Sequence, residues 1–133
     1  MTPAARLQAT IEILDEVIAS AREDGPPADA IVTRYFKTRR YAGSKDRRAV
    51  RELVFRAIRT AAERPVSGRA ALLGLARSDP ALLDFFGEQR GPAPLAENEP
   101  VAEPGIVPAW LVAEFSPLVG SNEWPTLLER APL

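Results

Sequence analysis

Residues 41–64 read YAGSKDRRAVRELVFRAIRTAAER, and this stretch decides the fold. Its apolar residues recur every three or four positions, which is the spacing of one face of a helix. That face consists of Val50, Leu53, Val54, Ala57, Ile58 and Ala61. Ser44 is a suitable N-cap residue, and Arg64-Pro65 is a suitable end. The stretch therefore predicts a helix from Ser44 to about Arg64 that is buried along one side.

Two amphipathic helices are expected before this one. Thr2-Pro3 is typical of a helix start, and apolar residues then recur with helical spacing. The buried face predicted for this first helix consists of Leu7, Thr10, Ile11, Leu14, Val17, Ile18 and Ala21. Gly25-Pro26-Pro27 ends it and starts a second helix, expected from about Pro27 to Arg40. The inward positions of the second helix are Ile31, Val32, Tyr35 and Phe36.

The chain beyond the third helix changes character twice. Two short helices are expected at 68–77 and 80–86, with Gly87 as the residue that ends the second. Most of the prolines come later, and residues 91–107 form an acidic, proline-rich stretch without periodicity. Such a stretch either is mobile or wraps the surface of the domain.

Short helices return in residues 108–133 according to the sequence pattern. No stretch of the chain alternates apolar and polar residues as a half-buried strand does. We therefore expect an all-α fold of six or seven helices that forms a single domain over residues 1–133. A chain of this length is large enough to fold around a core without disulfides or metal.

Positive charge is concentrated in residues 34–69. This segment holds 12 of the 17 Lys and Arg residues against three acids, so its net charge is +9. Residues 1–33 carry two cations and six acids, and residues 70–133 carry three cations and nine acids, so these segments sum to −4 and −6. The overall charge of −1 hides this separation. Clustered cations favour a polyanionic partner, because they release the counterions condensed on its phosphates.

The corner between the second and third predicted helices is the candidate RNA-binding site. Its residues are Arg39, Arg40, Tyr41, Lys45, Arg47, Arg48 and Arg51. The start of the third helix offers free backbone N–H groups to a phosphate, and Tyr41 is suited to stack on an exposed base. The alternative is an ordinary charged surface, balanced for example by a pair between Arg48 and Glu52. Phe55, on the same helix, is better explained as a core residue.

Several kinds of chemistry are excluded or disfavoured by composition. The chain has no Cys and no His, so it lacks the commonest catalytic base, thiolates and the commonest zinc ligands. Glu12, Asp15 and Glu16 have the spacing of a carboxylate cluster, but solvated charges on the outer face of a helix explain them better than a metal site or an acid–base pair. No apolar run is long enough to span a bilayer. We expect a cytoplasmic chain without an active site or a metal.

Residues 41–59 resemble the "DR…ELVYGVLR" helix in the N-terminal domain of the Sun/RsmB-type ribosomal RNA cytosine-5 methyltransferases. That domain is similar to the antitermination factor NusB, an all-α RNA-binding protein. The other stretches that resemble the family, in the same order, are Ala4 to Leu14, Ala28 to Phe36, Pro108-Ala109-Trp110-Leu111 and Leu127 to Leu133. One departure is Arg56, since the family often has Gly there.

The resemblance implies a NusB-like domain that recruits 16S ribosomal RNA to a methyltransferase. Its expected partners are ribosomal RNA and its own C-terminal methyltransferase domain, with no membrane and no metal. That domain, expected after Leu133, binds S-adenosylmethionine and carries two cysteines, so this chain has no cofactor of its own. The parent protein is then an enzyme, whereas residues 1–133 alone are not.

Two other functions remain open from the sequence. The chain is alternatively a protein–protein docking module, whose basic face meets the catalytic domain or a ribosomal protein. It is also compatible with a free-standing factor of the antitermination type. Binding of a 16S fragment, compared with plain duplex RNA, separates RNA recognition from docking.

Overall fold

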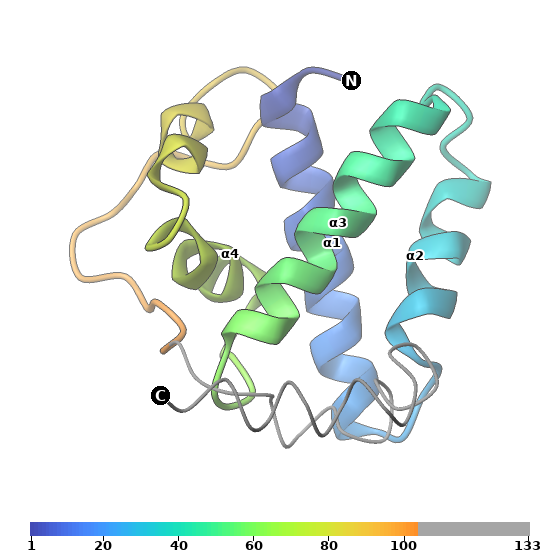
Figure 1. Ribbon diagram of the computed structural model, residues 1–133, viewed down its shortest axis with the longest axis horizontal. Coiled ribbons are helices and arrows are strands. Elements are labelled where there is room, and N and C mark those ends of the chain that lie inside the picture. The colour runs from blue at the N-terminus through green and yellow to red at the C-terminus, as the bar shows by residue number, and fades with distance from the viewer. Residues whose placement is uncertain (104–133) are drawn as a thin grey trace.

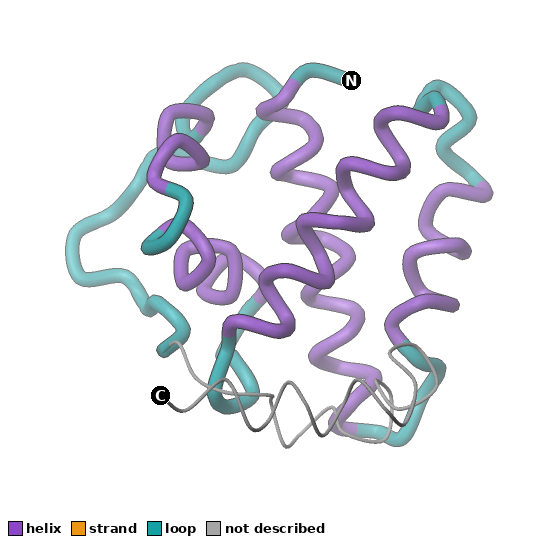
Figure 2. The backbone as a smooth tube through the Cα atoms, in the orientation of Figure 1, coloured by secondary structure: helices purple, strands orange, loops and turns teal. Residues whose placement is uncertain are grey.

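Five helices make up the part of the chain that the computed structural model describes, residues 1–103. In chain order they are α1 (Pro3–Arg22), α2 (Ala28–Lys37), α3 (Ser44–Thr60), α4 (Gly68–Ala76) and the 3₁₀-helix η1 (Pro80–Phe85) (Figure 1). No strand occurs within this range, which confirms the all-α prediction there (Figure 2). Five helices are fewer than the six or seven expected, and the helices predicted in residues 108–133 lie outside the described residues.

Helix α1 is the centre of the arrangement, since it contacts all four of the other helices. Its buried face is wider than the predicted stripe, because Ala9 and Ile13 are also buried. The predicted inward residues of α2 are all buried. On α3, Val50, Val54, Ala57 and Ile58 are buried as predicted, and Leu53 and Phe55 pack half-buried against the core.

The helix boundaries follow local signals with two corrections. Thr2 caps α1 as predicted, because its Oγ1 accepts a hydrogen bond from the N–H of Ala5 at 3.0 Å. Gly43, not Ser44, is the N-cap of α3, and the carboxylate of Asp46 accepts a hydrogen bond from the N–H of Gly43 at 3.1 Å. Helix α2 ends earlier than predicted, so residues 38–43 form a longer loop before α3, and α3 itself ends at Thr60 instead of near Arg64.

Helix α4 lies against α1 at an unusually close point. The N–H of Gly68 donates to the Asp15 carboxylate at 2.7 Å. A Cβ atom at Gly68 would lie 2.3 Å from the carbonyl oxygen of Ile11, so only glycine fits. Gly68, the first residue of α4, thus joins α4 to a part of α1 that is distant in the sequence.

The proline-rich stretch wraps the surface over residues 91–103. Its end is held by two backbone hydrogen bonds, from Ala102 N–H to the Ala70 carbonyl at 3.0 Å and from Ala62 N–H to the Glu103 carbonyl at 2.9 Å. Arg69 also binds the Glu99 carboxylate through two nitrogens, at 2.6 and 3.2 Å. The wrapped alternative is therefore confirmed for residues 91–103.

Candidate nucleic-acid interface

The predicted basic corner is a loop whose middle is anchored to the core. The backbone turns twice, through hydrogen bonds from Arg39 N–H to the Phe36 carbonyl and from Ala42 N–H to the Arg39 carbonyl. Ala42 is buried, whereas the Tyr41 side chain beside it is 71% exposed. The loop therefore presents an aromatic ring and its flanking cations to solvent from a fixed backbone.

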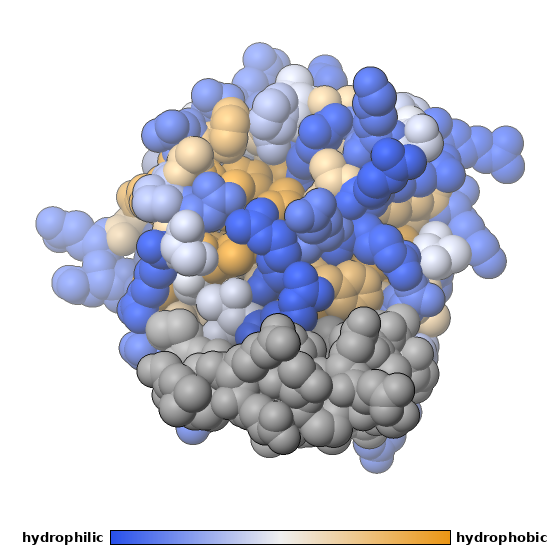
Figure 3. Space-filling view, in the orientation of Figure 1, coloured by the Kyte–Doolittle hydropathy of each residue, from blue (hydrophilic) through white to orange (hydrophobic). Residues whose placement is uncertain are grey.

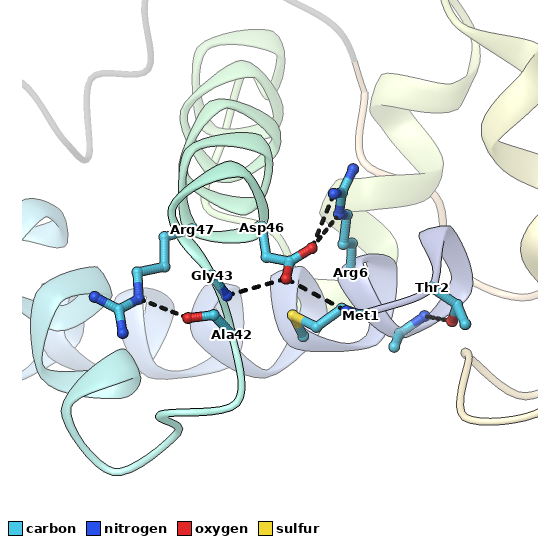
Figure 4. A network of polar contacts seen from close by, with 8 residues as sticks. Met1, Thr2, Arg6, Ala42, Gly43, Asp46 and Arg47 are labelled. Atoms are coloured by element: carbon cyan, nitrogen blue, oxygen red, sulfur yellow. Dashed lines mark hydrogen bonds and ion pairs between the residues drawn. The ribbon is translucent and has the colours of Figure 1, made fainter.

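Asp46 is the one acid between Arg39 and Arg51, and it faces α1 instead of the corner cations. Figure 4 shows its carboxylate directed toward Arg6 and Met1, with Arg47 on the other side against Ala42. Its oxygens lie 2.8 Å from Arg6 Nη2 and 3.3 Å from the amino group of Met1. The hydrogen bond from Arg6, followed by that from Gly43 N–H, holds the pKa of Asp46 below its usual range. Asp46 therefore does not neutralise the corner cations.

Three of the predicted site cations have no partner within residues 1–103. Arg40, Lys45 and Arg48 are exposed, and none of them has a hydrogen bond or an ion pair in the described part of the chain. In particular, the alternative pair between Arg48 and Glu52 is not formed. Exposed cations that are not paired within the fold are available to the phosphates of a nucleic acid.

The other three predicted cations have partners within the fold. Arg39 donates to the Tyr35 carbonyl at 2.9 Å, and its guanidinium carbon lies 3.7 Å from the centroid of the Tyr35 ring. Arg51 forms an ion pair with Asp29. The Nε of Arg47 donates to the Ala42 carbonyl at 3.1 Å, which holds the loop to the start of α3. The predicted site thus divides into exposed cations and cations that build the corner.

A groove between α2 and α3 extends the basic surface. Its volume is about 380 Å³, and it is lined by Val32, Thr33 and Phe36 from α2 and by Arg47, Arg48 and Arg51 from α3. Figure 3 shows apolar surface between these helices among hydrophilic side chains. Guanidinium groups bind phosphate oxygens through two parallel hydrogen bonds, and the apolar wall suits a sugar or a base.

The groove was not predicted from the sequence. Val32 and Phe36 were predicted to be core residues, and Thr33 was not singled out. Their role in the groove depends on where α3 packs, and the helical spacing alone does not reveal that. The signal within the sequence was limited to the arginines on the opposite wall.

The three carboxylates of α1 diverge to separate partners. Glu12 accepts hydrogen bonds from Tyr35 and Gln8, and Asp15 accepts from the N–H of Gly68. Glu16 pairs with Arg34 at 3.2 Å. The sequence had indicated that these carboxylates are solvated charges, whereas in the structure each of them has a partner within the fold. Within residues 1–103, no group of three acids is placed to hold a metal ion, and no helix is long and apolar enough to cross a membrane.

Comparisons with protein-family models, curated proteins and solved structures find no match to this chain. The relation to the methyltransferase family therefore remains a prediction from the sequence strings. The positions and partners of the cations at the corner and in the groove do not depend on that relation.

Proposed function

We propose that this chain is an RNA-binding module, which holds a single-stranded or irregular RNA segment at the corner between α2 and α3. The observation that carries the proposal is that Arg40, Lys45 and Arg48 have no partner within the described residues. The one acid between them in the sequence, Asp46, is paired with Arg6 of α1 instead. Packed cations of like sign repel one another, so their clustering is unfavourable for the fold alone.

The contact chemistry follows from the arrangement. The exposed cations bind phosphates, and Arg48, which also lines the groove, can make a two-pronged guanidinium contact. Tyr41 supplies a ring on which an unstacked base can lie, and such stacking is characteristic of proteins that bind single-stranded RNA.

The finer proposal is that the chain recruits 16S ribosomal RNA for a cytosine-5 methyltransferase through a NusB-like domain. The support is the sequence resemblance of residues 41–59, which contain most of the corner and nearly all of α3. On this proposal the methyl donor, S-adenosylmethionine, binds to a separate catalytic domain. The helical chain binds the RNA and offers a surface on which the catalytic domain can dock, and the protein acts in the cytoplasm.

A mobility-shift titration of the full chain tests the proposal. At roughly 50–100 mM salt, where phosphate contacts are strong, we expect a single-stranded 16S fragment to shift at lower protein concentration than a plain RNA duplex of equal length. A chain that shifts neither RNA, but binds a separately produced methyltransferase domain, would be a docking module. That result would overturn the RNA proposal.

A further inference from the structure

A second cavity lies on the α1 side of the corner loop. Its volume is about 510 Å³. The polar side chains that line it come from five parts of the chain: Thr2 before α1, Gln8 and Glu12 of α1, Tyr35 of α2, Tyr41 of the corner loop and Arg90 after η1. Residues far apart in the sequence therefore converge on one space that is large enough for a small planar ligand.

The carboxylate of Glu12 is held in place from two sides. The hydroxyl of Tyr35 donates to its Oε1 at 2.5 Å, and the Nε2 of Gln8 donates to its Oε2 at 3.2 Å. Burial, followed by the hydrogen bond to Glu12, raises the pKa of Tyr35, so the hydroxyl remains a donor at neutral pH. The guanidinium of Arg39 lies over the ring of this tyrosine. Glu12 is thus an acceptor whose position is fixed before any ligand arrives.

Hydrogen-bonding capacity remains in this pair. Each carboxylate oxygen of Glu12 has a further lone pair, and Gln8 has a second N–H and a carbonyl oxygen that have no partner in residues 1–103. Glu12 can only accept hydrogen bonds, Gln8 can both donate and accept, and Thr2, Tyr41 and Arg90 line the same pocket with further donors. At Glu12 the acceptor-only carboxylate fits the exocyclic amino group of a base such as cytosine, and it repels the carbonyl oxygen that uracil has at that position.

We propose that this pocket binds one unstacked, amino-bearing nucleobase of the RNA strand held at the corner. Glu12 accepts from the amino group, Gln8 donates to the adjacent ring nitrogen, and the ring of Tyr41 stacks on the base. Arg40, next to Tyr41 in the chain, and Arg90 then face the neighbouring phosphates. The inference rests on the proposed RNA function and adds a base preference, which phosphate contacts alone do not give.

Two RNA octamers of equal charge and similar size test the preference. Affinity of the full chain for fluorescent C8 and U8 is measured by anisotropy at about 100 mM salt. We expect C8 to bind about tenfold more tightly, which is the scale of one matched base contact. The Glu12→Gln variant keeps an acceptor for Tyr35 but offers an N–H to uracil, so the ratio of the two affinities should fall toward one.

Tyr41 provides an independent readout. Tyr41→Ala should weaken both octamers by about tenfold and leave their ratio unchanged, because stacking tolerates either base. Tyr41→Phe is the matched control and should bind like the original chain. Circular dichroism confirms that each variant is folded.

The outcomes separate this inference from the function on which it rests. Equal affinities for C8 and U8, with no response to Glu12→Gln, would overturn the base pocket. If a Lys45→Ala/Arg48→Ala variant still weakens both octamers, the corner proposal survives that result. A chain that binds neither octamer overturns both proposals.

Discussion

The surroundings of α4 and the corner between α2 and α3 use charge in opposite ways. Around α4, each cation that contacts the neighbouring segments meets a carboxylate: Arg56 with Asp79, Arg69 with Glu99 and Arg77 with Glu103. At the corner, three cations remain exposed without partners among residues 1–103. The first region is organised for stability, and the second keeps its charge available to another molecule.

The largest stability effect is expected where α4 meets α1. In Gly68→Ala the added methyl group would lie 2.3 Å from the Ile11 carbonyl oxygen, and backbone cannot yield as a flexible side chain does. Overpacking of this kind costs about 3 kcal/mol. Urea denaturation of the variant and the original chain gives this difference in the free energy of unfolding.

The matched control is Gly43→Ala, at the corner. The nearest atom to an added Cβ there is Asp46 Oδ2 at 4.0 Å, and its φ of −79° suits any residue. We expect a change below about 0.5 kcal/mol, as for substitutions that meet no obstacle. Similar losses at both glycines would contradict the contrast in packing between the two regions.

A smaller effect is expected from the ion pair that holds the wrapping segment. Arg69→Ala removes both contacts to Glu99 and the hydrogen bond to the Pro94 carbonyl. The pair is partly exposed, so we expect a loss of about 1 kcal/mol. Hydrogen exchange should become faster at Ala102 N–H, which is bonded to Ala70. An unchanged exchange rate at this amide would show that the segment is held by other contacts.

The pairing of Asp46 with α1 is recognised by its pH dependence. Its pKa is lowered in the folded chain, so its contribution to stability is present above its ordinary value of 3.8 and is lost as the pH falls through the folded pKa. Asp46→Asn should therefore be less stable than the original chain at pH 7, and the difference should shrink as the pH falls below 3.8 and through the folded pKa. Thermal melts of both proteins across this range measure it, and a difference independent of pH would contradict the pairing.

Local signals in the sequence were sufficient for most of the helices. Thr2, the Gly25-Pro26-Pro27 turn and the apolar spacing act within a few residues, so the corresponding structure could be predicted. The N-cap of α3 is Gly43 instead of Ser44, because the carboxylate of Asp46 accepts a hydrogen bond from the N–H of Gly43.

The site was predicted only as a region. The cluster of cations is visible in the sequence. Which of them are engaged within the fold depends on partners from distant segments, such as Asp29 for Arg51, and the sequence pattern does not reveal these partners. The base pocket was missed for the same reason. Gln8 and Glu12 stand four residues apart on α1, but Tyr35 approaches Glu12 only through the packing of α2 on α1.

The salt dependence of RNA binding tests the central claim most directly. Lys45→Ala/Arg48→Ala is compared with Arg22→Ala/Arg64→Ala, which removes two exposed cations from the opposite end of the helices (Figure 1) and likewise breaks no ion pair within residues 1–103. The corner variant should bind a single-stranded 16S fragment about tenfold more weakly at ~100 mM salt, and its slope of log affinity against log salt should fall by about 1.4. The control variant should keep the original slope. Equal losses in both variants would show that net charge, and not the corner, binds the RNA.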